Sequence, residues 1–127
     1  MKETISTSHA PAPIHNLYSQ GVLGEGKFLF TSGQVGLNPK SGTLVDGVQE
    51  QTRQALENIS AIVKAGGADM SSVVKVTVLL ENIEDFADMN EVYQTFFAKK
   101  PPARTAFEVG RLPLGALVEI EAIAVVD

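Results

Sequence analysis

The most constraining feature of this 127-residue sequence is a long segment with helical periodicity that begins after Asp46. Its apolar side chains recur every three or four positions, which places them along one face of a helix. Asp46 is the predicted N-cap, Gln49 is placed to complete a capping box, and Gly66-Gly67 supplies the C-terminal stop. The predicted stripe consists of Val48, Thr52, Ala55, Leu56, Ile59, Ile62 and Val63.

A second segment with helical periodicity follows Asn82, its predicted N-cap, and Pro101-Pro102 ends it. Its apolar residues again share one face, and Asn90 lies on or beside that face. A helix with a single apolar stripe buries that stripe against one neighbouring layer. The predicted buried residues of this helix are Phe86, Met89, Tyr93, Phe96 and Phe97.

Runs of β-branched and other apolar residues before, between and after the helices predict strands. Two of these runs, Ser19–Leu23 and Lys27–Ser32, flank Gly24-Glu25-Gly26, and we expect them to form a hairpin around this connection. The turn-forming residues at positions 38–42 predict a loop, Gly33–Gly47, before the first helix. The other predicted strands are Lys2–Ile5, Val73–Leu80, Ala103–Val109 and Leu117–Val126.

The order of these elements predicts an α+β domain in which both helices pack on one face of a mixed sheet. A chain of this length makes one domain, residues 1–127, and it cannot cover both faces of the sheet well. The second face of the last strand nevertheless carries apolar residues, so we expect that face to meet another subunit. The residues of that face are Glu119, Glu121, Ile123 and Val125.

Composition excludes several functions. The chain has no cysteine, which rules out disulfides, thiolate nucleophiles and cysteine-based zinc sites. His9 and His15 lie in a proline-rich segment and are interpreted as loop residues, so no metal site is predicted. The net charge of −5 argues against a nucleic-acid partner. Neither a signal peptide nor a membrane span is apparent, and we expect a cytoplasmic protein.

Arg104 is the first candidate for a binding role. It follows Pro101-Pro102-Ala103, a stiff approach to a predicted strand. A guanidinium held in this way suits a carboxylate, which it binds with two parallel hydrogen bonds. The alternative is an ordinary surface arginine paired with an acidic side chain, and composition alone favours that alternative.

The other candidates are acidic or lie at a strand end. Glu119 and Glu121 project from one face of an apolar strand, where burial could raise a carboxyl pKa enough for acid–base chemistry. A solvated face explains them as well, equally for Glu119 and better for Glu121. Ser32-Gly33-Gln34 ends a strand and could offer backbone N–H groups to an anion, but ordinary turn composition is the explanation that the residues alone favour.

Taken together, these strings resemble the Rid family, the YjgF-like reactive-intermediate deaminases of the endoribonuclease L-PSP group. The similarity covers nearly the whole chain in the family's order, and the C-terminal strings are the most diagnostic. The matching segments are residues 18–21 (YSQG), 30–34 (FTSGQ), 38–42 (NPKSG), 51–59 (QTRQALENI), 74–78 (VKVTV), 86–93 (FADMNEVY), 102–105 (PART) and 118–124 (VEIEAIA).

The resemblance implies a chorismate-mutase-like fold and a homotrimer with active sites in clefts between subunits. It implies hydrolysis of 2-aminoacrylate, 2-aminocrotonate and their imine tautomers, 2-iminopropanoate and 2-iminobutanoate, to 2-keto acids and ammonia. No cofactor and no metal are implied, and the expected partner is a small imino or keto acid. Two alternatives remain: a non-catalytic trimer that binds small carboxylates, and an endoribonuclease or translation inhibitor.

Roles are carried over residue by residue. Arg104 matches the arginine that binds the substrate carboxylate, and Glu119 matches the acidic residue that positions the attacking water. Asn90 matches a position near the site. The resemblance also assigns three residues to the substrate cleft, namely Tyr18, Ser32 and Gly33.

Two positions depart from the family pattern. Asn16-Leu17 replaces a Gly-Pro pair before Tyr18, which predicts a less rigid approach to that tyrosine. Ala106 replaces a cysteine that many active members carry two residues after the arginine, which predicts a slightly wider pocket. These departures leave open a different enamine substrate, such as an aminomuconate.

Overall fold

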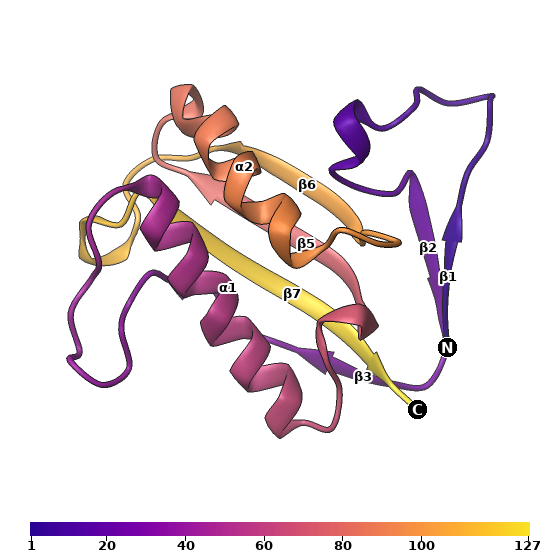
Figure 1. The fold of residues 1–127 in the computed structure, drawn as a ribbon, viewed down its shortest axis with the longest axis horizontal. Coiled ribbons are helices and arrows are strands. Elements are labelled where there is room, and N and C mark those ends of the chain that lie inside the picture. The colour runs from indigo at the N-terminus through magenta and orange to yellow at the C-terminus, as the bar shows by residue number, and fades with distance from the viewer.

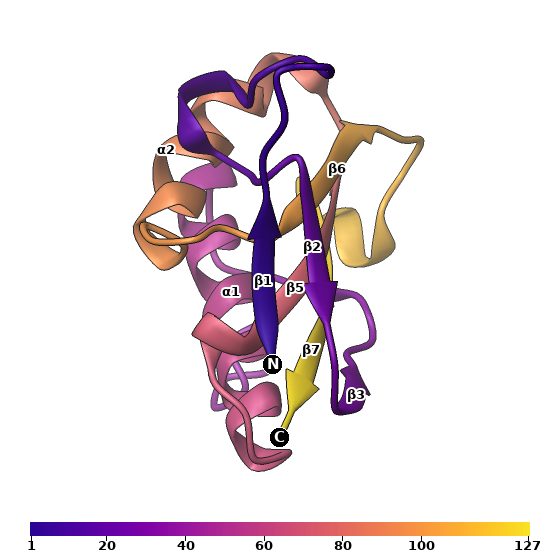
Figure 2. The same ribbon diagram turned by 90° about the vertical axis from the view of Figure 1, so that its right-hand side faces the viewer.

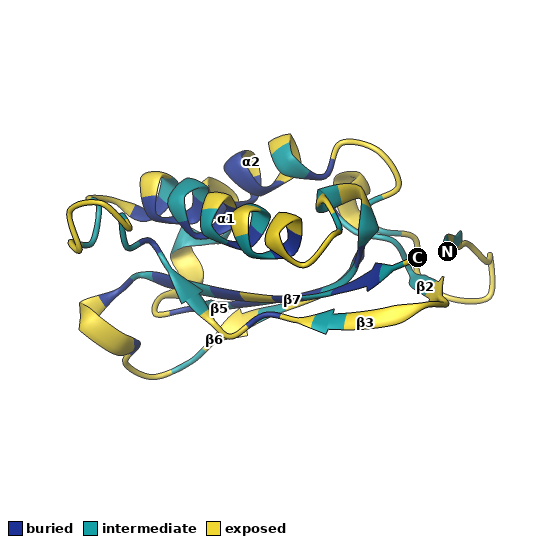
Figure 3. Ribbon diagram, turned by 90° about the horizontal axis from the view of Figure 1, so that it is seen from below, coloured by how far each residue is buried: buried dark blue, intermediate teal, exposed yellow.

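Two helices cover one face of a mixed β-sheet in the computed structural model, which describes residues 1–127 (Figure 1 and Figure 3). The helices are α1 (Val48–Ala65) and α2 (Phe86–Phe96). The predicted α+β layer arrangement is therefore confirmed. The strands of the sheet are β3 (Lys27–Phe30), β4 (Gln34–Val35), β5 (Val73–Leu80), β6 (Ala103–Glu108) and β7 (Val118–Val126).

The strand order is β3-β7-β5-β6, and β4 also pairs with β7. β5 and β6 run parallel, whereas β7 is antiparallel to β3, β4 and β5. The parallel pair is joined by α2, as expected because parallel strands need a long crossover. β6 is consequently an edge strand, and Arg104 on it pairs in register with Val76 of β5.

The core lies between the sheet and the two helices. Alternate residues of β7 and β5 face the helices and are buried, as the period of two along a strand requires. The apolar stripes predicted for both helices face this layer. Its fully buried members include Leu56, Ile59, Val63, Val76, Val78, Met89, Tyr93, Val118 and Ile120.

The predicted hairpin is wrong. β2 (Gly21–Gly24) pairs with β1 (Lys2–Ile5) in a separate two-stranded ribbon, whereas β3 pairs with β7 at the other end of the chain (Figure 2). Gly26 has a φ of 132° and packs against the Val126 carbonyl, so the connection redirects the chain from one sheet to the other. Local turn chemistry indicates that two strands are joined, but it does not choose their partners.

The predicted N-cap of the first helix is also wrong. Gly47 occupies that position with a φ of 84° and makes no side-chain capping bond. Gln49 does not close a capping box, since its amide donates to the Asp88 carbonyl of α2. The predicted stop at Gly66-Gly67 is confirmed. Asn82 caps the short 3-10 turn η3 (Ile83–Asp85), which leads directly into α2.

The face of the sheet opposite the helices is largely uncovered, as Figure 3 shows. Three aromatic side chains on the strands are substantially exposed: Phe28 (56%), Phe30 (69%) and Phe107 (45%). Phe28 and Phe30 pair in register with Val125 and Ile123 of β7. An apolar patch of this kind is typical of a surface that contacts another protein. Neither helix of this chain combines the length and apolarity that crossing a bilayer requires.

Candidate active site

Arg104 is placed by two segments that lie far apart in the sequence. The backbone N–H of Ser19 donates to the Pro102 carbonyl at 3.2 Å, and its hydroxyl donates to the Pro101 carbonyl. These bonds fasten the segment that carries Tyr18 to the stiff approach of β6. Tyr18 and Arg104 are thereby neighbours, with the guanidinium carbon 5.8 Å from the tyrosine ring centroid.

The guanidinium of Arg104 lies among aromatic rings and one amide. Nη1 donates to Asn90 Oδ1 of α2 at 2.6 Å. The guanidinium carbon is 4.7 Å from the ring centroid of Tyr93 and 5.5 Å from that of Phe86. Such distances over aromatic rings are attractive for a cation. Because the oxygen of Asn90 is engaged by Arg104, its amide nitrogen is the group left to donate to a bound molecule.

Arg104 has no carboxylate partner within the chain. The two ion pairs lie elsewhere, between the N-terminus and Asp127 and between Arg53 and Glu50. Burial lowers the pKa of Arg104, although the partial negative character of Tyr93 and Tyr18 opposes that shift. An arginine stays protonated despite such a shift. A half-buried cation without a counter-ion is suited to bind an external anion, and the planar fork matches a carboxylate.

A cavity of about 710 Å³ opens beside this guanidinium. Its walls come from α2, β6 and the 3-10 turn η1 (Ile14–Asn16). Of the three residues that depart from the pattern of the resemblance, Leu17 and Ala106 lie in its lining. The lining combines apolar and polar side chains, as in most small-molecule sites. The lining residues include Ile14, His15, Leu17, Tyr18, Phe86, Asn90, Gln94, Arg104 and Ala106.

The η1 turn forms one wall of the cavity in a conformation that is uncommon for its residues. His15 and Asn16 have φ values of 52° and 55°, in the left-handed region. Asn tolerates that region better than most residues, which suits the position where the family pattern has glycine. The backbone N–H of Leu17 donates to the Ile14 carbonyl, and its side chain is buried. These two contacts place Tyr18 beside the cavity; the less rigid approach expected from Asn16-Leu17 stays a prediction.

Ser32, Gly33 and Glu119 lie together at a different place. Glu119 projects from β7 between two fully buried neighbours, Val118 and Ile120, so its side chain points to the face opposite the helices. Gly33 packs directly against that carboxylate, since a Cβ at Gly33 would stand 2.0 Å from Glu119 Oε2. Ser32 is exposed next to this contact.

The six residues that the sequence assigned to one site therefore form two groups within a chain. Tyr18, Asn90 and Arg104 meet on the helix side of the sheet. Glu119 lies on the other side and two strands away, which corresponds to about 10 Å across the sheet. A small molecule bound by Arg104 cannot reach the Glu119 of the same chain, so any shared site has to be completed by a second chain.

Replacing Gly33 with alanine is expected to displace the Glu119 carboxylate. The new methyl group would occupy the place of Oε2, and a flexible carboxylate moves at little cost in stability. We expect the free energy of unfolding to change by less than about 1 kcal/mol. Turnover, in contrast, should fall sharply, because the Glu119 carboxylate no longer occupies its place. Urea unfolding and turnover of the variant check this, and Gly110→Ala, in open space and without a positive φ, controls for a glycine-to-alanine change away from the carboxylate.

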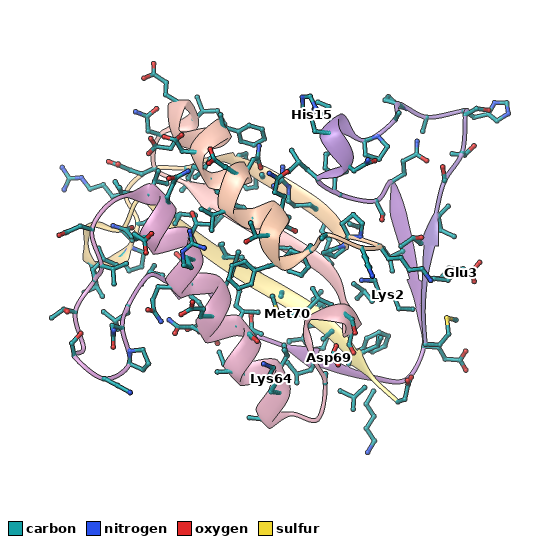
Figure 4. The ribbon with its side chains drawn as sticks, in the orientation of Figure 1. Lys2, Glu3, His15, Lys64, Asp69 and Met70 are labelled. Carbon is teal, nitrogen blue, oxygen red and sulfur yellow. The ribbon has the colours of Figure 1, made fainter.

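The aromatic residue behind Arg104, Tyr93, has an unusual environment. Its side chain is fully buried, and its hydroxyl has no hydrogen-bond partner. Burial raises the pKa of Tyr93, while the charge of Arg104 acts in the opposite direction. Of the two other groups with shifted pKa values, Asp69 accepts hydrogen bonds at η2 (Met70–Ser72), far from the cavity (Figure 4), and Lys2 lies on the β1–β2 ribbon.

Tyr93→Phe is expected to stabilise the protein, increasingly so at high pH. Removing an unpaired buried hydroxyl gains about 1–3 kcal/mol. The pKa of Tyr93 is raised on folding, so the unfolded phenol ionises first, near pH 10. Wild-type stability therefore falls as pH rises above about 10, and the variant loses that component. Urea unfolding of both proteins at pH 8 and pH 11 checks this; a constant difference would contradict it.

Sequence reasoning missed several lining residues. Phe86 was interpreted as core or interface, but it faces the cavity and the guanidinium. His15 was interpreted as a loop residue, and it stands at the cavity on the η1 turn, toward α2 (Figure 4). Gln94 was not considered. Phe86, Asn90 and Gln94 are spaced four residues apart and so lie on one helix face, and this spacing is the sequence signal that indicates Phe86 and Gln94 beside Asn90.

The fold and the sequence together define the class of protein. Residues 7–126 match the family described as Endoribonuclease L-PSP, and the chain belongs to this family. Among its relatives, the rat protein 2-iminobutanoate/2-iminopropanoate deaminase is 51% identical over 126 residues, which cover 98% of this chain and 90% of the rat protein. The Rid-family resemblance predicted from the sequence is thereby confirmed.

Solved structures of related proteins have the same fold as this chain. The crystal structure of the YjgF gene product of E. coli is 44% identical, has a TM-score of 0.75, and aligns with 97% of this chain and 98% of its own. The structure of E. coli TdcF with bound serine is 41% identical with a TM-score of 0.77, covering 98% of this chain and 99% of its own. This protein therefore has the fold of the YjgF and L-PSP proteins.

Proposed function

We propose that this protein hydrolyses reactive imines and enamines, such as 2-iminobutanoate and 2-iminopropanoate, to 2-keto acids and ammonia. The observation that carries the proposal is Arg104, a half-buried guanidinium without a counter-ion beside a cavity. Two relatives support it. The rat relative is a deaminase of these imines, and TdcF holds serine, which like these imines carries a carboxylate next to a nitrogen-bearing carbon.

In the proposed reaction, Arg104 first binds the substrate carboxylate through two parallel hydrogen bonds. The amide nitrogen of Asn90 donates a further bond, and the side chain of the substrate extends toward Ala106 and Leu17. Water adds to the imine carbon and gives a carbinolamine, which loses ammonia to leave the keto acid. Imines hydrolyse in water unaided, so fixing substrate and water in attack geometry supplies most of the acceleration. No cofactor enters this scheme.

The water is proposed to be held by Glu119 of a neighbouring subunit. Glu119 carries one proton from the attacking water to the imine nitrogen, which gives the carbinolamine, and then carries the carbinolamine hydroxyl proton to the departing amine, so that both water protons leave in ammonia. This arrangement requires a homotrimer with clefts between subunits, in a chorismate-mutase-like assembly. The exposed aromatic residues Phe28, Phe30 and Phe107 on the uncovered face of the sheet support it. Light scattering is expected to give three chains, and a monomer would contradict the shared site.

Two alternatives predict different results. A non-catalytic trimer would bind 2-keto acids through the same Arg104 but would not accelerate their formation. An endoribonuclease, as the family description suggests, or a translation inhibitor needs phosphate contacts from Lys and Arg. Arg104 is the single Lys or Arg in the cavity lining, and the chain has a net charge of −5, so we favour a small carboxylate over RNA as the ligand.

A coupled assay tests the proposed function. A serine or threonine dehydratase generates the imine in place, and formation of the keto acid is followed with and without this protein. We expect wild type to accelerate keto-acid release and Arg104→Ala not to do so. Binding of 2-oxobutanoate without acceleration would establish the non-catalytic alternative. Salt-sensitive RNA cleavage that depends on Arg104 would overturn the deaminase proposal.

A further inference from the structure

The guanidinium of Arg104 needs a support that leaves its hydrogen-bond donors free. A carboxylate partner would fix it, but that partner would also compete with the substrate for the fork. The chain provides no such partner, and hydrogen bonds within the chain engage only Nη1, which donates to Asn90 and lies 3.9 Å from the Met89 sulfur. A long arginine side chain loses rotamer freedom when it is fixed, so another contact has to hold it in place.

Three aromatic rings surround the guanidinium, and they differ in how firmly they are held. Tyr18 and Phe86 line the cavity and are partly exposed. Tyr93 is the nearest at 4.7 Å, is fully buried in the core, and packs against Phe97 with ring centroids 4.8 Å apart. Of the three rings, Tyr93 alone is fully buried, so it is the ring that joins the guanidinium most directly to the core.

We propose that the Tyr93 ring is the positioning residue for Arg104, in the place where a counter-ion would otherwise stand. The face of an aromatic ring attracts a cation without occupying any of its N–H donors. Arg104 is thereby held flat and charged, with its fork open toward the cavity. The hydroxyl of Tyr93 has no partner, so the ring carries this role and the hydroxyl does not.

This inference rests on the proposed function, because it concerns how the carboxylate-binding arginine is held. It predicts that Tyr93 determines affinity for the carboxylate. Loss of a cation–π contact of this kind weakens binding by about 3- to 30-fold. It is distinct from a packing role, because Phe97 is buried in the same cluster and stacks on Tyr93 without being one of the rings around Arg104.

The test compares Tyr93→Phe, Tyr93→Leu and the matched control Phe97→Leu. Calorimetric titration with 2-oxobutanoate is expected to show a Kd raised about 3- to 30-fold for Tyr93→Leu and changed less than about twofold for the other two. Phe97→Leu should nevertheless lose thermal stability comparably to Tyr93→Leu. Tyr93→Met replaces Tyr93→Leu if the latter does not fold. Unchanged affinity in Tyr93→Leu, or equal weakening in Phe97→Leu, would overturn the proposal.

A second readout does not depend on activity or ligand binding. The chain has three arginines, Arg53, Arg104 and Arg111, so their side-chain Nε–Hε signals can be assigned by substitution. The Arg104 signal is expected to be shifted by the Tyr93 ring, to keep that shift in Tyr93→Phe, and to move toward the signals of exposed arginines in Tyr93→Leu. If wild type binds no keto acid, the proposed function fails, but this spectrum still tests the role of Tyr93. An Arg104 signal that does not move in Tyr93→Leu would overturn the proposed positioning role.

Discussion

Replacing Arg104 with alanine is expected to abolish imine hydrolysis while the fold is retained. Removing one partner of a buried, hydrogen-bonded charge pair costs about 2–5 kcal/mol in binding, which corresponds to a loss of roughly 30-fold to several thousand-fold. Stability should change little, because the lost side chain is a partly desolvated cation without a counter-ion. The coupled assay and urea unfolding of the same preparation measure the two effects.

Two further substitutions sharpen this prediction. Arg104→Lys keeps the charge but loses the planar fork, and we expect it to recover little of the activity. Arg104→Met keeps an apolar stem beside Tyr93 and Phe86, and it should match the stability of wild type with no activity. Parallel loss of thermal stability and turnover in all three variants would count against a role for Arg104 in the reaction.

Glu119→Gln is expected to have the second largest effect. The amide keeps the size of the side chain and its contact with Gly33, but it cannot accept the proton of an attacking water. Loss of a general base lowers the rate by about 10²–10⁴-fold. Affinity for 2-oxobutanoate should be unchanged, since Arg104 and Asn90 remain in place, so kcat falls while binding persists.

Glu121→Gln is the matched control for that substitution. Glu121 lies two residues further along β7, on the same face of the sheet, and is exposed. The sequence favoured a solvated role for it, and activity should stay within about twofold of wild type because surface substitutions of this kind have small effects. If Glu121→Gln and Glu119→Gln lowered turnover equally, the effect would belong to the charge of the face and not to Glu119.

The elements that could be predicted from the sequence were those with a local signal. Periodicity located both helices, and Gly66-Gly67 located the end of α1, because helix formation depends on neighbours three or four residues away. Strand pairing does not share this property. β3 pairs with β7 across most of the chain, so the expected hairpin around Gly24-Glu25-Gly26 had a plausible turn and the wrong partners.

In the candidate site, too, the features with a local sequence signal could be predicted and those that depend on distant segments could not. Tyr18, Asn90 and Arg104 meet in the structure, as the resemblance implied, because the Ser19 bonds to Pro101 and Pro102 bring two distant segments together. No local pattern indicates such bonds. The sequence also does not indicate the aromatic contacts of Arg104, because the pattern of Tyr93 and Phe86 is that of ordinary core residues on an amphipathic helix. Their contact with the guanidinium depends on how α2 crosses β6.

The central claim is that Arg104 of one chain and Glu119 of another serve one site. Within a chain the two side chains lie on opposite faces of the sheet, so neither Arg104→Ala nor Glu119→Gln homotrimers should be active, whereas a mixture of the two can be. In a closed ring of three, every mixed trimer pairs one intact Arg104 with one intact Glu119. Random assembly therefore restores about one quarter of the wild-type sites.

The most direct measurement is to unfold the Arg104→Ala and Glu119→Gln proteins, refold them together in equal amounts, and follow keto-acid formation in the coupled assay. We expect about one quarter of wild-type activity, while each variant refolded alone stays inactive. An inactive mixture that still assembles as trimers would contradict the shared site and show that the two residues do not act together across a subunit interface.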